Sequence, residues 1–326
     1  MKLPHRRKFL HLAAGAAALS ALPRVARAQP YPTQPVRIIV GYPPGGATDA
    51  MARLIAQQLS ERLGQQFIVD NRPGPGGNIG TEAVVRSQPD GYTLLLIFSA
   101  NAINATFYDK LSFNFIRDIA PVAGIARSPF VMEVHSSVPA KTVSEFISYA
   151  KASPGKLRMA SNGNGTTAHI AGELFKLMTG VDMVHVPYRG PESALTDLLA
   201  GKVQVRFGIP LESIEYIRAG KLPVLAVTTA ARSEVLPDIP TVGEFVPGYE
   251  ASAFLGIGAP KNTPPEIVDK LNREINAVLS DPRIRARLVE VGGTVLAGTS
   301  ADFGKLIADE TEKWGKVIRA ANIKPE

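Results

Sequence analysis

The chain has no cysteine and few histidines, and both absences narrow its chemistry. Without cysteine, neither a disulfide framework nor a lipid-anchored cysteine is possible. Beyond residue 28 the histidines are His135, His169 and His185, and no Gly-x-Ser-x-Gly segment occurs, so hydrolase triads lack their usual pieces. His169 and Glu173 lie four residues apart on a predicted helix, but a metal site needs a second pair of ligands. We therefore expect neither an enzyme nor a bound cofactor or metal.

Acidic residues are missing from positions 1–28, which hold six basic ones: Lys2, Arg6, Arg7, Lys8, Arg24 and Arg27. Removing this segment lowers Lys+Arg from 36 to 30 against 29 Asp+Glu, so the remaining chain is close to neutral, about +1. The basic balance of the whole chain is therefore not the footprint of a nucleic-acid partner.

The same segment has the pattern of an export signal. Paired arginines at 6 and 7 precede an apolar stretch from Leu12 to Leu22, and Ala26-Arg27-Ala28 has the small-x-small cleavage pattern. The arginine pair followed by Phe-Leu resembles a twin-arginine signal. The apolar stretch is short for a membrane span. We expect cleavage near Ala28 and a soluble protein in the periplasm.

About 300 residues remain, which is more than one ordinary core holds and suits two domains. The hydrophobic content of 45% and the charged content of 20% are ordinary for a globular protein. No period of 20 to 50 residues repeats, so a solenoid is not expected.

A Gly-rich loop at 41–49, Gly-Tyr-Pro-Pro-Gly-Gly-Ala-Thr-Asp, joins a strand-like run at 36–40 to an amphipathic run at 48–63. The first N–H groups of a helix have no intrahelical partner and carry partial positive charge, so they attract a carboxylate or phosphate. Gly45 and Gly46 leave the backbone accessible, and Thr48 is a candidate helix cap. The alternative is a tight turn that binds nothing.

A second loop of the same design occupies 161–169, Ser-Asn-Gly-Asn-Gly-Thr-Thr-Ala-His, between a strand-like run at 157–160 and a helical run at 168–179. Two such loops, about a hundred residues apart, favour two lobes facing one ligand. We call 41–49 the first loop and 161–169 the second loop.

Strands and helices alternate along both halves. The runs at 36–40, 66–69 and 93–98 are separated by helical patterns, as are those at 157–160, 183–186 and 203–207, which indicates buried parallel strands in α/β sheets. Segments 118–135 and 251–259 look like strands that cross between lobes, so the hinge should consist of two strands. We expect lobe 1 to comprise 29–126 and 251–326, and lobe 2 to comprise 127–250.

The Gly-rich run at 74–80 invites a dinucleotide-binding interpretation, but the spacing is wrong. Ile79 stands where the third glycine of that fingerprint should fall, and an exported protein meets little nicotinamide cofactor. A structural turn that shapes the cleft wall is the alternative.

Several linked motifs together resemble the Bug family, the periplasmic solute-binding receptors of tripartite tricarboxylate transporters. The resemblance extends over the whole chain beyond the export segment. It rests on Pro44-Gly45-Gly46-x-x-Asp49, Asn71-Arg72-Pro73-Gly74, Pro89-Asp90-Gly91-Tyr92-Thr93-Leu94, Val186-Pro187-Tyr188-Arg189-Gly190, Ala194-Leu195-Thr196-Asp197-Leu198 and Trp314-Gly315-Lys316-Val317-Ile318.

The resemblance implies an α/β, two-lobed Venus-flytrap periplasmic binding protein fold that closes on a small organic carboxylate. It implies that the two loops hold one carboxylate through backbone N–H groups and ordered water, and that the partners are the transporter's membrane subunits. Receptors of this type are usually monomers. A ligand-sensing receptor that presents the acid to a sensor is the alternative, with a periplasmic enzyme as a third.

One position departs from the family pattern similar to Gly-Gln-Val-Asp-x-x-Phe-Asp. The last acidic position is Gly208 here. An acid there would meet a ligand ammonium group, so its absence argues against an amino-acid ligand; equally, the glycine enlarges the pocket for a bulkier acid.

The predicted ligand-binding residues lie in these loops and at nearby strand ends. Ser99 and Asn101 follow the strand at 93–98, where α/β sheets bind ligands, although a polar connection is the alternative. Asp49 suits a structural or water-positioning role, and Tyr188 suits either a ligand wall or lobe packing. Arg189 suits a surface ion pair, with a bidentate pair to a second ligand carboxylate as the alternative. The full set is Tyr42, Gly45, Gly46, Ala47, Thr48, Asp49, Ser99, Asn101, Ser161, Asn162, Gly163, Gly165, Thr166, Thr167, His169, Tyr188 and Gly208.

Overall fold

The computed structural model describes residues 31–290 and 293–325. The predicted export signal lies outside the described residues. By contacts the chain divides into two units, Met1–Thr33 and Gln34–Glu326. Of the first unit only 31–33 are described, with a cis Tyr31–Pro32 peptide bond. Every element below belongs to the second unit.

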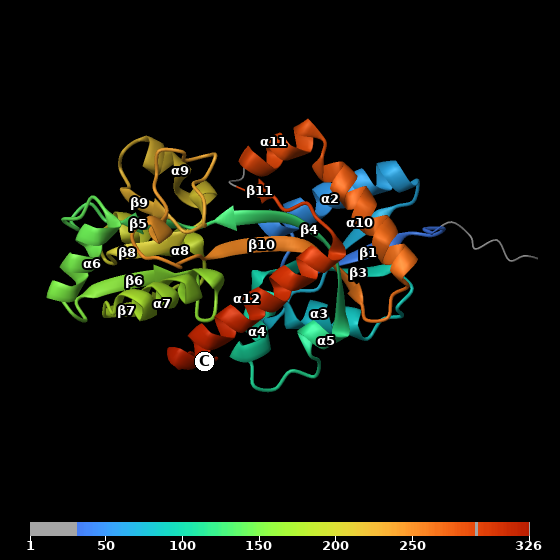
Figure 1. The fold of residues 1–326 in the computed structure, drawn as a ribbon, viewed down its shortest axis with the longest axis horizontal. Coiled ribbons are helices and arrows are strands. Elements are labelled where there is room, and N and C mark those ends of the chain that lie inside the picture. Colours follow the sequence, from blue (N-terminus) through green and yellow to red (C-terminus); the bar gives the residue numbers. More distant parts are fainter. Residues whose placement is uncertain (1–30, 291–292, 326) are drawn as a thin grey trace, which may run out of the picture. The chain divides into compact units, whose positions relative to one another are not determined.

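The first sheet is mixed and has six strands in the order β11-β4-β10-β3-β1-β2 (Figure 1). Strand β1 pairs in parallel with both β2 and β3, as the apolar runs predict, whereas β10 pairs antiparallel with β3 and β4. The strands are β1 (Val36–Val40), β2 (Phe67–Asn71), β3 (Thr93–Phe98), β4 (Ile119–Pro129), β10 (Ser252–Pro260) and β11 (Thr294–Val295).

Helices from both ends of the described chain pack around this sheet, with α12 contacting both α4 and β4, and α10 contacting β4 and α2. Helix α4 begins directly where β3 ends, at a point where the sequence indicates only a polar connection. The helices are α2 (Ala47–Leu63), η2 (Pro75–Gly77), α3 (Asn78–Val85), α4 (Ser99–Phe107), α5 (Phe115–Asp118), α10 (Pro265–Leu279), α11 (Pro282–Glu290) and α12 (Ser300–Ala320).

The second sheet has five strands in the order β7-β6-β8-β5-β9. Strands β6, β7 and β8 are parallel, and β5 pairs antiparallel with β8 and β9. The strands are β5 (Val131–Val134), β6 (Leu157–Ser161), β7 (Met183–Pro187), β8 (Val205–Gly208) and β9 (Val224–Val227); the helices are α6 (Val143–Ala152), α7 (Thr167–Thr179), α8 (Pro191–Leu199), α9 (Pro210–Arg218) and η3 (Val242–Glu244).

Two strands connect the sheets. Strand β4 ends at Pro129 in the first sheet, and β5 begins at Val131 in the second, so one continuous extended segment serves both. The return strand β10 pairs with β4 from Ser252↔Pro129 to Pro260↔Ile119. The sequence predicted one crossing strand over 118–135; the structure divides it at Phe130, whose N–H donates to Thr228 Oγ1 at 2.8 Å. The fold is a two-lobed α/β fold with two crossing strands.

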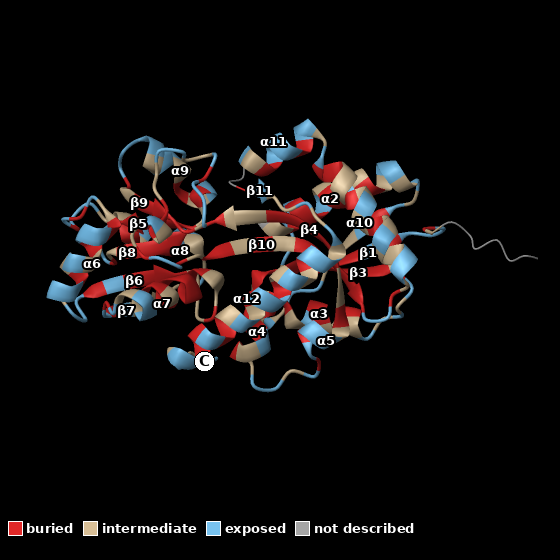
Figure 2. Cartoon of the chain, in the orientation of Figure 1, coloured by how far each residue is buried: buried red, intermediate tan, exposed pale blue. Residues whose placement is uncertain are grey.

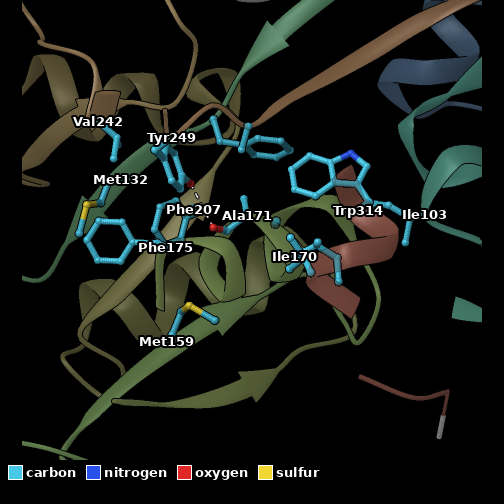
Figure 3. Packing of buried hydrophobic residues seen from close by; sticks show 14 of the residues in the cluster. Ile103, Met132, Met159, Ile170, Ala171, Phe175, Phe207, Val242, Tyr249 and Trp314 are labelled. Carbon is cyan, nitrogen blue, oxygen red and sulfur yellow. Dashed lines mark hydrogen bonds between the residues drawn. The ribbon is translucent and has the colours of Figure 1, made fainter. Parts of the chain in front are cut away.

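The cores of both sheets are apolar and buried, as the strands in Figure 2 show. A large cluster joins residues of β1 and β3 to others of β5, α7 and α12. Figure 3 shows part of it, where the Tyr249 hydroxyl donates to the Ala171 carbonyl at 3.1 Å and its ring meets Phe175 edge-on. Trp314 of α12 is fully buried in the same cluster.

This topology fixes where a ligand site can form. The parallel strands β1 and β3 share one carboxyl edge, and β6, β7 and β8 share another. Loops at such edges are the usual ligand-binding positions of α/β sheets. The first loop follows β1 and the second loop follows β6, so each lies at one of these edges.

Candidate functional site

The first loop ends in an open helix N-terminus. The N-cap of α2 is Gly46, with no side-chain cap, so the prediction of Thr48 as the cap is wrong: Thr48 lies inside the first turn. Gly45 has φ +91°, a conformation that side chains resist, and both glycines are exposed. A Cβ added at either would meet no atom within 4 Å, so the backbone faces open space.

Asp49 organises this loop from inside. One carboxylate oxygen accepts from the Gly45 N–H at 3.0 Å and from Arg53 Nε at 2.9 Å, and the other accepts from Asn71 Nδ2 at 2.9 Å. The hydrogen bond from Arg53, joined by those from Gly45 and Asn71, lowers the pKa of Asp49 to about 2. Asn71 also donates to the Tyr42 carbonyl. These bonds favour the structural role for Asp49.

The Asp49 carboxylate does not bond the first described backbone N–H groups of α2. Among the described residues, no acceptor bonds the backbone N–H groups of Gly46, Thr48 and Asp49, and the Ala50 N–H makes the first helical bond, to the Gly46 carbonyl. Free N–H donors at the positive end of a 17-residue helix favour an anion.

The Gly-rich run at 74–80 forms the wall behind the first loop. A Cβ on Gly41 would lie 2.7 Å from the Gly77 Cα, so the two backbones touch only because both residues are glycine. The Tyr42 ring packs edge-on against Phe98, with centroids 4.4 Å apart, and burial raises the pKa of the Tyr42 phenol. The run is thus a structural turn in the described chain.

Ser99 and Asn101 lie at the carboxyl end of β3 but point into the protein. Both are buried, at 2% exposure. Ser99 Oγ accepts from the Phe254 N–H, while Asn101 accepts from the Phe98 N–H and donates to Thr81 Oγ1. These bonds favour the structural alternative for both, and ligand contact by them stays a prediction.

The second loop is held by bonds among its own residues. Ser161 Oγ donates to the Gly163 carbonyl at 3.0 Å and accepts from the Gly163 N–H at 3.2 Å. Thr166 is the N-cap of α7: its Oγ1 accepts from the His169 N–H and donates to the Gly163 carbonyl. The N–H groups of 167 and 168 have no acceptor among the described residues.

Two stacked imidazole rings contact the second loop. The rings of His169 and His185 lie 3.6 Å apart and nearly parallel, at 7°. His169 Nδ1 accepts from the Gly165 N–H at 3.1 Å, and His185 Nε2 lies 2.7 Å from Ser161 Oγ. Burial, together with the neighbouring His169, lowers the pKa of His185 to about 4. His185 is therefore neutral at neutral pH, and the two rings support the backbone of the second loop.

On its outer side the second loop meets helices of the first sheet. A Cβ on Gly165, which has φ +73°, would lie 2.6 Å from the Phe107 ring of α4. Asn164 Nδ2 donates to the Lys324 carbonyl at 2.7 Å. The N–H of Gly165 is thus bonded to His169, and its Cα faces a packed ring.

Tyr188 directly follows β7 and Gly208 ends β8, the strands on either side of β6. The Tyr188 hydroxyl donates to Asp197 at 2.9 Å, and burial with this bond raises the pKa of Tyr188 to about 12. Its ring packs against a small apolar cluster under α8, which favours lobe packing. Gly208 lies beneath the side chain of Arg206, and that arrangement contradicts an enlarged pocket at this position.

Arg206 is the centre of a buried ionic group that the sequence analysis did not find. It is fully buried and faces Glu133, its cross-strand partner on β5, with Arg206 Nε 3.3 Å from Glu133 Oε2. Arg206 also bonds Glu212 of α9 and donates to the Pro191 carbonyl at 3.2 Å. Ser213 donates to Glu133. Burial raises the pKa of Glu133 to about 7, against the pull of Arg206.

The structure therefore gathers the predicted residues into two groups. The first loop residues surround Asp49, and the second loop residues surround the His169–His185 stack and the ends of β7 and β8. Missed participants are Asn71, His185, Glu133, Arg206 and Glu212. A polar residue inside an apolar strand run is the one signal in the sequence that marks His185 and Arg206.

The described ranges contain neither a candidate membrane span nor a candidate metal cluster. No helix among residues 31–290 and 293–325 is long and apolar enough to cross a bilayer. The same ranges contain no group of three or more metal-ligating side chains. Glu173 accepts from Lys176 at 2.9 Å and lies 3.7 Å from His169 Nε2, so an internal cation already faces that carboxylate.

Two lobes joined by two strands, with a Gly-rich loop at a carboxyl edge of each, define a solute-binding protein. The family model of the tripartite tricarboxylate transporter family receptor matches residues 51–323. The chain belongs to this family, whose members are periplasmic solute-binding receptors.

Known relatives agree in sequence and fold. Protein BugT of Bordetella pertussis is 36% identical, covering 91% of this chain and 92% of BugT. A structure of Rpa4515 from R. palustris with adipate is 38% identical, with a TM-score of 0.78, and covers 91% of this chain and all of that one. MatC (Rpa3494) from Rhodopseudomonas palustris with bound malate is 29% identical, with a TM-score of 0.74, over 88% of this chain and all of that one.

Proposed function

We propose that this protein binds a small organic carboxylate between its two loops and delivers it to the membrane subunits of a tripartite tricarboxylate transporter. The observation that carries this proposal is that the N–H groups of Gly46, Thr48 and Asp49, at the N-terminus of α2, have no acceptor among the described residues. The adipate and malate complexes of the two relatives support a carboxylate.

In this proposal the residues divide by role. The N–H groups of Gly46, Ala47 and Thr48 bind one ligand carboxylate, and those of Thr167 and Ala168 approach it from the second lobe, with ordered water between. Asp49, Ser161, Gly163, Gly165, Thr166 and His169 shape the two loops through the bonds described above.

Four charge-assisted hydrogen bonds of roughly 1.5 to 3 kcal/mol each reach the ~8 kcal/mol of micromolar binding before ordering and closure costs are counted. The far end of the ligand must therefore contribute. We place the export signal at 1–28, the mature protein in the periplasm as a monomer, and the lobe boundaries near 126, inside β4, and near 250, just before β10.

The test is a thermal-shift screen of residues 29–326 against mono-, di- and tricarboxylates, aromatic acids and amino acids. Ligand at a hundredfold excess over Kd adds ~2.7 kcal/mol of stability, which raises Tm visibly. Small-angle scattering at saturation then reports compaction on closure. Protein that has been partially unfolded and dialysed excludes a co-purified ligand as the reason for a flat screen.

Gly46→Asp is the diagnostic variant. It places a carboxylate where the ligand's carboxylate is proposed to bind, while aspartate is itself a favoured N-cap, so the fold is retained. Gln57→Asp, exposed farther along α2, adds the same charge away from the loop and serves as the control. Binding lost in the first variant and kept in the second supports the proposal; equal binding in both contradicts it.

A further inference from the structure

The space above Gly208 is already occupied by charge. A Cβ added to Gly208 would lie 2.5 Å from Arg206 Nη2, 2.7 Å from Arg206 Nε and 2.7 Å from Glu133 Oε2. The guanidinium therefore lies along β8 toward the carboxyl edge of the sheet, and the glycine is what lets it pass. Position 208 contributes no pocket volume and no acid.

The carboxylate of Glu212, from α9, lies near the same carboxyl edge of the second sheet. Glu212, in the first turn of α9, bonds Arg206 Nη2 from the side that leads out of the core. The Glu212 side chain is 20% exposed, whereas those of Arg206 and Glu133 are 0% exposed. Glu212 is thus the member of this ionic group that solvent, and a ligand, can reach.

Glu212 also touches the second loop. The Asn162 side chain stabilises the ionised Glu212 carboxylate and so opposes the rise in the pKa of Glu212 that burial causes, and within the described chain Asn162 Oδ1 is buried without a hydrogen-bond partner. Asn162 directly follows β6, next to β8 in the sheet. An unpaired acceptor and a carboxylate therefore lie together at the edge where the second loop begins.

The Arg206 guanidinium is already paired with groups of the protein, so it is not available to bind a ligand carboxylate. Arg206 donates to Glu212 and the Pro191 carbonyl and faces Glu133, so one guanidinium meets two carboxylates and a carbonyl. Burial raises the pKa of Glu212, and the negative charge of Glu192, at the start of α8, adds to that rise. A second ligand carboxylate brought here would be repelled, whereas a hydroxyl or ammonium group would find acceptors.

We propose that Glu212, oriented by Arg206, accepts a hydrogen bond from the far end of the ligand, so that the protein selects a carboxylic acid bearing a hydroxyl or ammonium group over the dicarboxylic acid of equal length. This inference rests on the proposed carboxylate site in the loops. It deepens that proposal by naming the second functional group of the ligand.

Matched ligands test it by calorimetric titration. Succinate is compared with 4-hydroxybutanoate and 4-aminobutanoate, and adipate with 6-hydroxyhexanoate and 6-aminohexanoate, on the mature protein, Glu212→Gln and Glu215→Gln. Glu215 is an exposed glutamate of the same helix, so the last variant controls for the substitution itself.

In the unsubstituted protein we expect a hydroxy or amino acid to bind at least about tenfold more tightly than its diacid, the effect of one charge-assisted hydrogen bond. Glu212→Gln should reduce that ratio to about threefold or less, and Glu215→Gln should leave it unchanged. The ratio compares two ligands on one sample, so partial unfolding of a variant does not produce it. If Glu212→Gln does not fold, Glu212→Asp, which keeps the charge and shortens the reach, should lower the same ratio.

Tighter binding of the diacids, or a preference that survives Glu212→Gln, would overturn the inference and leave the carboxylate site standing. Diacids and donor-bearing acids that bind equally well would overturn it too. Absence of binding by any acid is a different result: it would refute the proposed function, and this inference with it.

Discussion

The two loops look alike in sequence and are built differently. Each joins a parallel strand to a helix through glycines, yet the first is organised by the charged Asp49 with Arg53 and the second by the stacked rings of His169 and His185. The first exposes its glycines to open space, whereas Gly165 of the second packs on Phe107. One loop is therefore shaped for an anion, and the other is shaped by the protein around it.

The difference teaches that a glycine motif does not define what its glycines do. At Gly46 the missing side chain leaves backbone N–H groups accessible. At Gly165 it admits an aromatic ring, and a left-handed conformation brings the N–H to an imidazole. Substitutions should separate these two roles.

The largest expected effect is that of Gly165→Ala. The methyl group meets both a φ of +73° and a ring atom 2.6 Å away, so we expect a loss of about 2 to 4 kcal/mol in the free energy of unfolding. Urea denaturation measures it. Gly46→Ala is the matched control: its φ of −81° suits alanine and its surroundings are open, so it should cost under about 1 kcal/mol. Equal losses of unfolding free energy in the two variants would show that Gly46 and Gly165 do not differ in role.

Asp49→Ala should rank next, at about 2 kcal/mol, because three donors lose their shared acceptor. Arg53 is half exposed, and solvent screens part of its pairing. Asp49→Asn keeps one carbonyl acceptor and should lose less. Chemical denaturation of both variants ranks them, and a loss for Asn as large as for Ala would mean that the hydrogen bonds do not carry the effect.

Acid should distinguish the loops. The pKa of Asp49 is lowered to about 2, so its stabilisation is complete above the unfolded pKa near 3.8 and disappears as the pH falls through 2. The pKa of His185 is lowered from 6.5 to about 4, so the unfolded chain takes up the proton first and stability falls as the pH drops from 6.5 to 4.

Denaturation midpoints at pH 7 and pH 4.5 check this for the unsubstituted protein and for His185→Asn. The variant should lose less stability on acidification than the unsubstituted protein. Glu133, whose raised pKa of about 7 favours the folded state at low pH, acts in the opposite direction in both proteins and cancels in the comparison. If both proteins lost the same stability between pH 7 and pH 4.5, His185 would not be the group responsible for the loss.

The smallest effect concerns Gly46→Asp without ligand. Aspartate at this N-cap position supplies the side-chain acceptor that α2 lacks, so we expect a gain of a few tenths of a kcal/mol. Differential scanning calorimetry detects the shift in Tm. A clear loss of stability would mean that the loop tolerates side chains less than its open surroundings indicate.

Much of the fold was predictable because the signals are local. The apolar runs at Val36–Val40 and Thr93–Phe98 match β1 and β3 residue for residue, and the helical run at 168–179 appears as Thr167–Thr179. Helix α4 was not predicted, because its asparagines are weak helix formers. Tertiary contacts stabilise it: Asn101 bonds the Phe98 N–H and Thr81, and Asn104 bonds the Gly76 carbonyl.

The site was predictable in position and less so in role. Both loops could be located, since strand ends and glycines are visible in sequence. That Asp49 faces inward, that Ser99 and Asn101 are buried, and that Arg206 lies over Gly208 could not be predicted, because each depends on a partner distant in the chain.

The sequence by itself determined the alternation of strands and helices, the crossing of two strands between lobes, the positions of both loops and the family. These follow from periodicity, turn residues and linked motifs, all of which act over short distances along the chain. Only the tertiary structure decided which glycines are open, which carboxylates are already paired and which acid is exposed at the end of β8. Burial and pairing are properties of neighbours in space, and the cross-strand contact of Glu133 with Arg206 brings together residues from separate strands of the second sheet.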